Sequence, residues 1–315
     1  MPDISVIIPV YNRSDELRMV LDSLCRQTLA AERFEVIIAD DGSAEDIQAV
    51  LKEYPKLQLK YARQPDEGFR VSAARNLGTD QASGRIIVYN DNGVILKSDV
   101  LEKHIAYHQK NDDAFVVLGY IFGMAWKADE DKMRHILENN NPDRAIELMK
   151  AEGGMGDGRD RYIEWNGEVE GWYLPWVALW GGHISVDAEF IKKHGIRWNE
   201  GFTSWGGEDN EYGLQLCKAG ARLSLCRDVE VVHYPTIDKR MDADDADFQA
   251  NHKKMRQYIL SLHPGRDVEA YAELGGGANS HELRTKFFQE RGWEPPEVPV
   301  PPEGQVPSKR PVPAK

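Results

Sequence analysis

The sequence predicts an α/β fold: one mostly parallel β-sheet with helices on both faces, followed by a C-terminal helical extension. Two observations predict it. Short β-branched runs alternate with helical apolar patterns over roughly the first 125 residues, which is typical of parallel sheets whose strands are joined by helices. Polar clusters also follow the predicted strands, and sheets of this kind bind ligands beyond the carboxyl ends of their strands.

The first strand–helix unit begins close to the N-terminus. Ile4–Pro9 is a β-branched run and predicts a strand, and Ser14 is placed to cap the helix that follows it. The apolar residues of that helix recur at the spacing of one helical face: Leu17, Val20, Leu21 and Leu24.

The second unit repeats the arrangement. Phe34–Ala39 predicts a strand, Ser43 caps the next helix with Asp46 at its third position, and Pro55 marks its end. The remaining elements of this part are predicted as strands and helices in alternation: Leu57–Ala62, Val71–Ala82, Ile86–Tyr89, Ser98–Lys110 and Phe115–Ile121.

Residues 127–168 differ from this pattern. They are charged, helical around Ile136–Lys150, and then broken by the glycine-rich run Gly153–Gly158. Because that run follows a helix and lacks the spacing of a dinucleotide-binding loop, we expect a plain flexible loop. The α/β pattern returns near Leu179, includes a short strand at Ile184–Val186, and runs to about residue 234.

Three regions follow from this organisation. We expect residues 1–262, which end in a helix over Asp244–Leu262, to form the main domain, and residues 263–292 to form the helical extension. Residues 293–315 are proline-rich and lack apolar periodicity, so we expect an extended, disordered tail.

Composition limits the possible partners and location. The 315 residues carry a net charge of −13, which argues against binding to nucleic acid or to an anionic membrane surface. No apolar run approaches the roughly 20 residues of a transmembrane helix, and the N-terminus lacks the features of a signal peptide. The three cysteines, Cys25, Cys217 and Cys226, lack metal-ligand spacing and indicate a reducing compartment. We therefore expect a cytoplasmic protein.

Two polar motifs end the first two strands. Pro9-Val-Tyr-Asn12 follows the first, and Asp40-Asp-Gly-Ser43 follows the second. Tyr11 can cover a base, and a carboxylate can accept hydrogen bonds from uracil N3–H or ribose hydroxyls. The second motif alone could be a simple turn with a helix cap. The two together, about 30 residues apart in a βαβ unit, favour a nucleoside pocket.

These motifs, with Gly68–Gly78, resemble the family-2 glycosyltransferases, which share the GT-A fold (a Rossmann-like nucleotide-diphospho-sugar transferase fold). The resemblance implies that residues 1–262 are the catalytic domain and that Arg75 holds phosphate or nucleoside oxygens through its planar guanidinium. It implies the following donor-binding residues: Pro9, Tyr11, Asn12, Asp40, Asp41, Arg75, Asn90, Asp91, Gly181 and Gly182.

A D-x-D triplet after the fourth strand binds a divalent cation in this family, since hard cations prefer anionic oxygens. Here the segment reads Tyr89-Asn-Asp-Asn-Gly93, so only Asp91 is acidic. The resemblance implies Mn²⁺ or Mg²⁺ on the donor diphosphate, held by Asp91, Asn92 and His233. The amides at Asn90 and Asn92 favour an alternative, a catalytically silent sugar-nucleotide-binding protein. A lone strand-end His233 could also be purely structural.

The run Trp205–Glu211 resembles the W-G-G-E-D segment of galactosyltransferase C-terminal regions and bacterial chondroitin polymerases. A helix N-terminus stabilises carboxylates, and sugar transfer needs one to deprotonate the acceptor hydroxyl. The resemblance implies that Asp209 is this base, that Glu208 orients hydroxyls, and that transfer is inverting, because retaining relatives carry Asn in place of Asp209.

A sugar pocket is implied near Trp180-Gly-Gly-His183, where small residues admit the donor and aromatic rings stack on a pyranose. The candidates for contact with sugar or acceptor are Trp180, His183 and Trp205, with Trp176 as a further aromatic; each tryptophan could equally be core.

The function predicted from the sequence is inverting transfer of a sugar from a UDP-sugar to an unidentified acceptor: a glycan, a peptide or a small molecule. A Rossmann oxidoreductase would need a glycine-rich fingerprint after the first strand, where this chain has Pro-Val-Tyr-Asn. A sugar-phosphate nucleotidyltransferase would need a glycine-rich basic loop near the N-terminus, and none is present.

Overall fold

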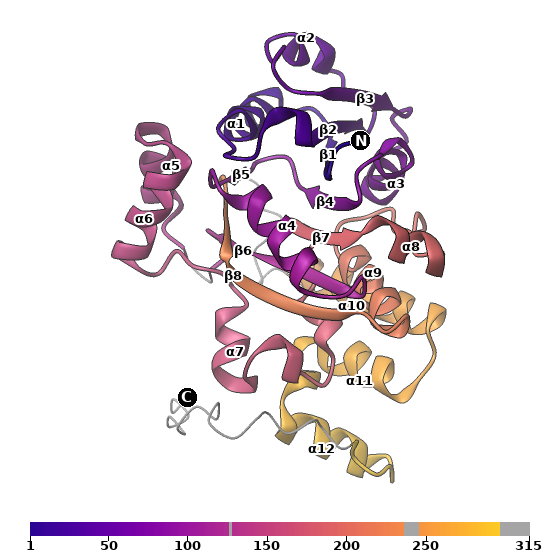
Figure 1. The fold of residues 1–315 in the computed structure, drawn as a ribbon. Coiled ribbons are helices and arrows are strands. Elements are labelled where there is room, and N and C mark those ends of the chain that lie inside the picture. Colours follow the sequence, from indigo (N-terminus) through magenta and orange to yellow (C-terminus); the bar gives the residue numbers. More distant parts are fainter. Residues whose placement is uncertain (126–127, 236–245, 297–315) are drawn as a thin grey trace.

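The computed structural model describes residues 1–125, 128–235 and 246–296. Its centre is an eight-stranded sheet with the order β3-β2-β1-β4-β7-β6-β8-β5, and helices cover both faces (Figure 1). The strands have these bounds: β1 Ile4–Val10, β2 Phe34–Asp40, β3 Leu59–Arg63, β4 Ile86–Asn90, β5 Val94–Leu96, β6 Phe115–Phe122, β7 His183–Asp187 and β8 Arg222–His233.

The predicted mostly parallel sheet is confirmed, and two strands, β7 and β5, run antiparallel to their neighbours. β3, β2, β1 and β4 are parallel neighbours, and β6 is parallel to β8. β7 lies antiparallel between β4 and β6, and β5 is antiparallel to β8. β6 therefore runs in the same direction as β4. The carboxyl ends of β1, β2, β4 and β6 consequently share one edge of the sheet.

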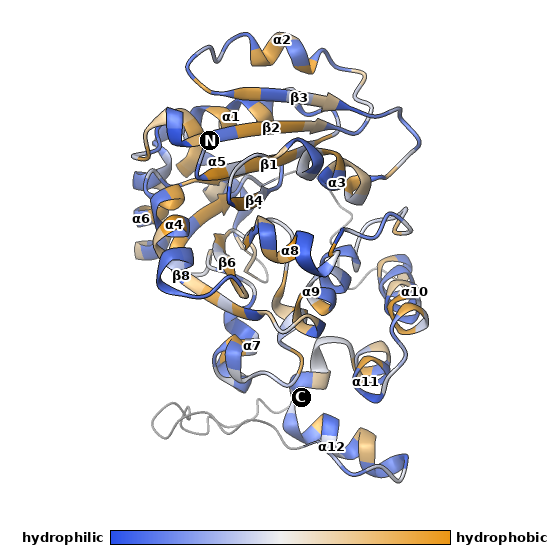
Figure 2. Cartoon of the chain, turned by 45° about the vertical axis from the view of Figure 1, so that its right-hand side comes forward, coloured by the Kyte–Doolittle hydropathy of each residue, from blue (hydrophilic) through white to orange (hydrophobic). Residues whose placement is uncertain are grey.

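The twelve α-helices of the described residues have these bounds: α1 Ser14–Cys25, α2 Ile47–Leu51, α3 Val71–Gln81, α4 Val100–Lys110, α5 Glu130–Asn139, α6 Pro142–Glu152, α7 Asp160–Asn166, α8 Ala188–His194, α9 Glu208–Lys218, α10 Ala246–Leu262, α11 Arg266–Leu274 and α12 His281–Glu290. In Figure 2 the helices carry both apolar and polar residues, whereas β1 and β2 are mostly apolar. No described helix is long and apolar enough to cross a membrane.

Two predicted helix caps are wrong. Ser14 is the first residue of α1, and the backbone N–H groups of Arg13 and Ser14 donate to the Glu45 carboxylate at 3.0 and 2.9 Å. α2 begins four residues after Ser43 and is capped by Asp46, which accepts from the Ala49 N–H. Both corrections arise because the loops after β1 and β2 bond to each other. Glu45 accepts at the start of α1, and the Ser43 hydroxyl accepts from the Asn12 N–H at 2.7 Å, which leaves the cap of α2 to Asp46.

The segment between β6 and β7 also differs from its prediction. The single helix expected around Ile136–Lys150 is two helices, because Asn141 caps a new helix that begins with Pro142. The glycine-rich run is not a plain loop. It is anchored by the buried pair Asp157–Arg159, at 2.6 Å, and the Gly123 N–H donates to the Met155 carbonyl at 2.8 Å.

The C-terminal part is helical, as predicted. α10, α11 and α12 pack against the main domain in one apolar cluster that includes Trp176, Phe202, Ile259 and Phe287. The expected boundary at residue 262 stays a prediction. Of the predicted tail, residues 297–315 lie outside the described residues, as do residues 244 and 245 of the helix expected to begin at Asp244.

Candidate active site

Arg75 is the centre of a group of charges drawn from separate segments. Its Nη2 donates to the Asp91 carboxylate at 2.8 Å, and its Nη1 lies 3.6 Å from Glu208. Asp91 follows β4, Arg75 lies on α3, and Glu208 begins α9. Only 2% of the Arg75 side chain is exposed, so burial weakens solvent screening of these interactions. Asp91, at the end of β4, and Glu208, at the start of α9, therefore both interact with the guanidinium of Arg75.

Asp209 joins this group through the backbone. Its carboxylate accepts from the N–H of Gly181 at 3.4 Å and from that of Asn210 at 2.7 Å. Burial raises the pKa of Asp209 above the usual aspartate range. Burial and the neighbouring Asp209 raise the pKa of Glu208 to about 7. A pair of carboxylates with raised pKa values beside a buried arginine is suited to proton transfer near neutral pH.

Glycines allow the close packing around Arg75. A Cβ on Gly181 would lie 2.8 Å from Arg75 Nη2, and one on Gly182 would lie 3.1 Å from Ile121. Gly206 and Gly207 have φ values of 98° and 92°, which only glycine adopts readily. They turn the chain so that α9 begins with its carboxylates at Arg75.

The residues predicted to hold the nucleoside of the donor lie at the same edge of the sheet. Tyr11 is 47% exposed, and its hydroxyl donates to Asp66 at 3.1 Å. Asp41 accepts from the Gln64 side chain at 2.5 Å and from the Arg70 N–H at 3.0 Å. A cavity of about 290 Å³ has Gln64 and Arg70 in its lining. Tyr11, Asp41 and the Gln64–Arg70 segment are thus placed together.

Other residues of the first two motifs hold the loops rather than face a ligand. Asn12 has a φ of 55°, and its side-chain oxygen accepts from the N–H groups of Ala44 and Glu45. Asp40 is fully buried and accepts from Tyr61 at 2.5 Å. Pro9 is a buried residue of β1. As placed, these three side chains support the loops; direct donor contact by them stays a prediction.

Asn90 is also turned inward. It is fully buried, and its amide donates to the carbonyls of Asp91 and Val94 at 3.1 and 3.0 Å. Its oxygen lies 2.7 Å from His183 Nδ1. Because an amide oxygen only accepts, His183 Nδ1 carries the proton. As placed, Asn90 and His183 therefore bond to each other inside the protein, and direct contact of either with a ligand stays a prediction.

The hydrogen bond to Asn90 fixes the direction of a longer buried chain. With its proton on Nδ1, His183 accepts at Nε2 from His104, 2.9 Å away. His104 Nδ1 then accepts from Ser185, whose oxygen accepts from His108; both distances are 2.8 Å. Burial lowers the pKa of His183 to about 3 and that of His108 to about 4. Neutral imidazoles thus hold Asn90, and Asn90 holds the backbone of Asp91.

This geometry predicts the effect of restoring the first acid of the triplet. Asn90→Asp should lower the free energy of unfolding by about 1–3 kcal/mol, because a carboxylate would face two carbonyls that now accept hydrogen bonds. It should leave Mn²⁺ affinity no higher. Asn92→Asp is the matched control and should fold normally. Urea unfolding and Mn²⁺ titration of both variants measure this. A stable Asn90→Asp protein with tighter Mn²⁺ binding would contradict it.

The three predicted metal ligands are Asp91, Asn92 and His233, and each presents a different kind of donor atom. The Asn92 side-chain oxygen is buried without a hydrogen-bond partner, and burial lowers the pKa of His233, which leaves its imidazole neutral. Asp91 is near enough to His233 to oppose that shift. One carboxylate, one amide oxygen and one neutral imidazole fit Mn²⁺ or Mg²⁺ as a partial set. The described residues contain no cluster of three His, Cys, Asp or Glu that could hold a metal.

The three tryptophans predicted near the sugar pocket differ in exposure: one is buried and two are partly exposed. Trp176 is buried core, edge-on to Tyr271. Trp180 is partly exposed and lies beside the glycine-rich run, with Arg159 over its ring at 5.2 Å. Trp205 is partly exposed against Phe248. Sugar contact by Trp180 and Trp205 stays a prediction, whereas the burial of Trp176 is that of a core residue.

Two residues that help to shape the candidate site, Trp198 and Asp66, were not predicted from the sequence. Trp198 stacks on Tyr212 at 4.1 Å and carries the Arg75 guanidinium 4.2 Å above its ring. Asp66 binds Tyr11 and lies so close to Gly42 that a Cβ on Gly42 would be 2.4 Å from the Asp66 nitrogen. Neither lies in a recognisable motif. The only sequence signal was the density of aromatic residues near residue 198.

Comparison with known proteins finds similarity to glycosyltransferases. Residues 5–157 match the glycosyl transferase family 2. Validoxylamine A glucosyltransferase of Streptomyces hygroscopicus is 32% identical over 249 residues, which are 77% of this chain and 58% of that protein. Chondroitin synthase of Escherichia coli is 27% identical over 77% of this chain and 36% of its own length. The chain thus spans a little over half of the first relative.

Solved structures show the same fold at low identity. S. aureus TarS residues 1–349, solved with UDP-GlcNAc, has a TM-score of 0.59 and 19% identity, covering 91% of this chain and 76% of that one. The mannosyltransferase PcManGT of Pyrobaculum calidifontis, solved with GDP-Man and Mn²⁺, has a TM-score of 0.57 and 16% identity, covering 92% and 75%. The sequence relatives support glycosyltransferase as the enzyme class. Residues 5–157 are thus similar to glycosyl transferase family 2, and the chain has the GT-A-like fold of these neighbours.

Proposed function

We propose that this chain is an inverting glycosyltransferase that moves a sugar from a UDP-sugar to an acceptor hydroxyl. The observation that carries the proposal is the convergence on Arg75 of Asp91, from the end of β4, with Glu208, from the start of α9. Asp209 lies beside them through Gly181. The UDP and UDP-GlcNAc complexes of the TarS neighbour support a uridine donor.

Each group has a defined task. Tyr11 and Asp41 hold the nucleoside, and Arg75 stabilises charge on the diphosphate as it leaves. Asp209 accepts the proton of the acceptor hydroxyl while the oxygen of that hydroxyl forms a bond to the anomeric carbon of the donor sugar. The bond from that carbon to the diphosphate breaks on the opposite face, which releases UDP with inversion. Glu208 orients hydroxyls and holds Arg75.

A divalent cation, when bound, would supply further positive charge to the diphosphate. Asp91, Asn92 and His233 would hold it. The Mn²⁺ complex of the PcManGT neighbour supports a divalent cation in general, and the one carboxylate among the three ligands implies weaker binding than a two-carboxylate site would give.

The second candidate is a sugar-nucleotide-binding protein without turnover. Asn90 and Asn92, which stand where the family has carboxylates, motivate it. The inward turn of Asn90 weakens that argument, because this side chain serves the backbone of Asp91. Asn92 alone then marks the difference from a two-carboxylate site.

A donor panel tests the proposal. Purified protein is heated with UDP-, GDP- and dTDP-sugars plus Mn²⁺, and the release of nucleoside diphosphate is measured in parallel. A ligand at 100 times its Kd adds about 2.7 kcal/mol of stability, so UDP-sugars should raise Tm by several degrees and be turned over. A UDP-dependent shift without UDP release would favour the second candidate, and no shift with any donor would refute both.

The pH dependence follows from the carboxylate pair. Because Asp209 must be ionised to accept a proton, kcat/KM should fall toward acid through the raised pKa of the pair, in a limb between the usual aspartate range and about 7. Removal of one charge by Glu208→Gln should move that limb to lower pH. A pH–rate profile with the best UDP-sugar measures both. A rate independent of pH from 4 to 8 would contradict the assignment of the base.

A further inference from the structure

A second cavity, of about 590 Å³, lies at the same sheet edge as the candidate active site. Tyr120 and Phe122 from the end of β6, Met149 and Lys150 from α6, and the glycine-rich run line it. The volume is within the range of small-molecule sites. In Figure 1 these elements lie together on the side where α6 and α7 flank β6 and β8.

The cavity is connected to the catalytic groups through Trp180. A Cβ on Gly158, a lining residue, would lie 3.0 Å from the Trp180 ring. The next residue, Gly181, donates to Asp209 and contacts Arg75. One indole therefore separates the lining of the cavity from the residue that positions the base.

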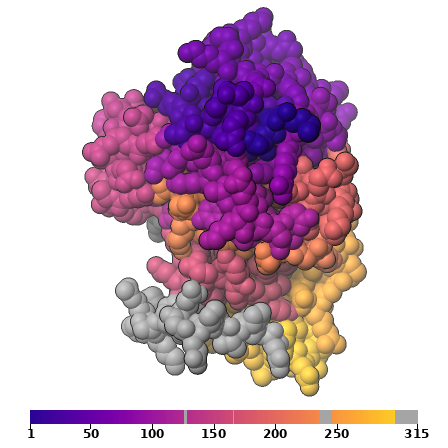
Figure 3. Space-filling model, viewed as in Figure 1, coloured from indigo at the N-terminus to yellow at the C-terminus, as the bar shows by residue number. Residues whose placement is uncertain are grey.

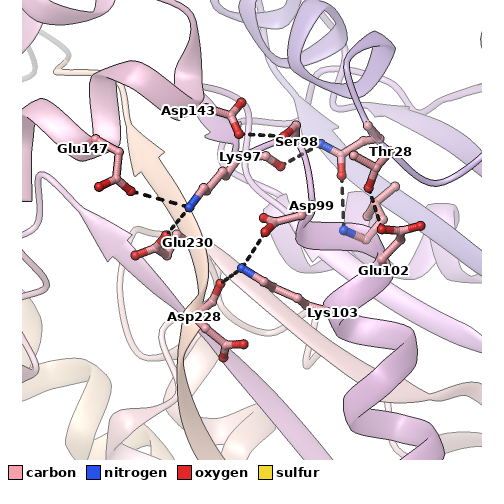
Figure 4. A network of polar contacts seen from close by, with 12 residues as sticks. Thr28, Lys97, Ser98, Asp99, Glu102, Lys103, Asp143, Glu147, Asp228 and Glu230 are labelled. Carbon is pink, nitrogen blue, oxygen red and sulfur yellow. Dashed lines mark hydrogen bonds and ion pairs between the residues drawn. The ribbon is translucent and has the colours of Figure 1, made fainter.

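The walls of the cavity are held in place. Lys97 binds Glu230 of β8 at 2.8 Å and lies 3.6 Å from Glu147 of α6, and Ser98 donates to Asp143 of α6 at 2.6 Å (Figure 4). α6 is thereby tied to the sheet. Figure 3 shows α5 and α6 standing out beside the strands on this face.

The charged side chains of the lining are close to balanced in number, with three basic residues (Lys150, Arg161 and Arg227) and four acidic ones (Asp157, Asp160, Glu164 and Glu230). Lys150 pairs with Glu230 at 2.6 Å, and Arg227 pairs with Asp160 at 2.7 Å. Asp157 is held by Arg159. A strongly charged ligand would gain little from side chains that already have opposite charges beside them. The lining thus favours a neutral molecule.

The lining also offers unused hydrogen-bonding groups. Within the described residues, no hydrogen bond engages the backbone N–H groups of Gly154, Gly156 and Gly158 or the exposed carboxylate of Glu164. Donors and acceptors side by side match hydroxyl groups, which do both. Tyr120 adds an aromatic ring.

We propose that this cavity binds the acceptor, as a neutral polyhydroxylated compound of one or two rings. The proposal rests on the proposed function, since it assigns the second substrate to this site. It gives the glycine-rich run a binding role: a side chain at Gly156 would meet the Tyr120 hydroxyl at 2.6 Å and occupy space at the wall.

Saturation-transfer NMR with cellobiose, myo-inositol, glucosamine and glucuronate tests the proposal. The neutral compounds should bind, and Glu164→Trp, which fills the cavity from α7, should weaken their binding at least tenfold. Glu282→Trp, on an exposed position of α12, is the matched control and should bind as the unchanged protein does. Glu164→Arg is the second variant, for use if the tryptophan prevents folding.

Absence of binding by both neutral compounds, or equal binding by the Glu164 variants, would overturn the proposal. UDP binding measured on the same samples keeps the two proposals separable. Loss of neutral-sugar binding with unchanged UDP binding supports the acceptor site. Failure of the unchanged protein to bind UDP would instead refute the proposed function, whatever the cavity binds.

Discussion

Asp209→Asn should reduce kcat by about 10²–10⁴-fold, the usual contribution of a general base, while the affinity for UDP changes less than twofold. The amide keeps the shape and can still accept from the Gly181 N–H, but it cannot take the proton of the acceptor. Burial, which raises the pKa of Asp209, makes the carboxylate a stronger base, so its loss is costly. Steady-state kinetics and UDP titration of the same preparation measure the two effects.

A matched variant distinguishes a base from a nearby charge. Asn210→Ala removes the next side chain of α9, whose amide bonds to the carbonyls of Val177 and Leu179 at 3.3 Å, and should lower kcat far less. Turnover by Asp209→Asn within fivefold of the unchanged enzyme would exclude Asp209 as the base.

Arg75→Ala should lower the free energy of unfolding by about 3–5 kcal/mol, the cost of removing one partner from a buried ion pair, and should abolish UDP binding. Asp91, Glu208 and Asp209 would then face one another without a cation, and the face of Trp198 would lose its guanidinium. Because the pKa values of Glu208 and Asp209 are raised, more of this pair is ionised at pH 8 than at pH 5, so urea unfolding should show a larger loss of stability at pH 8 than at pH 5.

Arg75→Lys is the control for charge. It keeps one positive charge but cannot form the planar contact with Trp198 or reach two carboxylates in fixed geometry. It should fold with a smaller loss of stability and bind UDP more weakly than the unchanged protein. If Arg75→Ala were within 1 kcal/mol of the unchanged protein, the buried charge cluster would not be a major source of stability.

The strands and the strand-end motifs were predictable because their signals are local. β1 and β2 are apolar at nearly every position, and the polar residues begin where these strands end. The antiparallel β7 was not predictable as such. Its direction depends on the path of residues 123–182, where charged helices and glycines give no strand pattern. The cap predicted at Ser14 failed for a related reason: Glu45, 31 residues away, accepts from the Ser14 N–H.

The candidate site was predictable as a set of positions but not as a set of orientations. Asp91, Asp209 and Arg75 come together as expected, whereas Asn90 and His183 turn inward to a histidine chain that depends on α4 and β7. Alternation along β4 distinguishes the two faces of the sheet, but it does not say which face holds the ligand. The role of Trp198, 123 residues from Arg75 in the chain, required the packing of α3 on the segment before α9.

Isothermal titration of UDP, with and without Mn²⁺, into the unchanged protein and Asp91→Asn tests the convergence most directly. If Asp91, Arg75 and the strand-end loops form one donor site, Mn²⁺ should tighten UDP binding at least tenfold, and Asp91→Asn should remove most of that gain while folding normally. Equal UDP affinities in all four titrations, or no UDP binding by the unchanged protein, would show that these residues do not form a donor site.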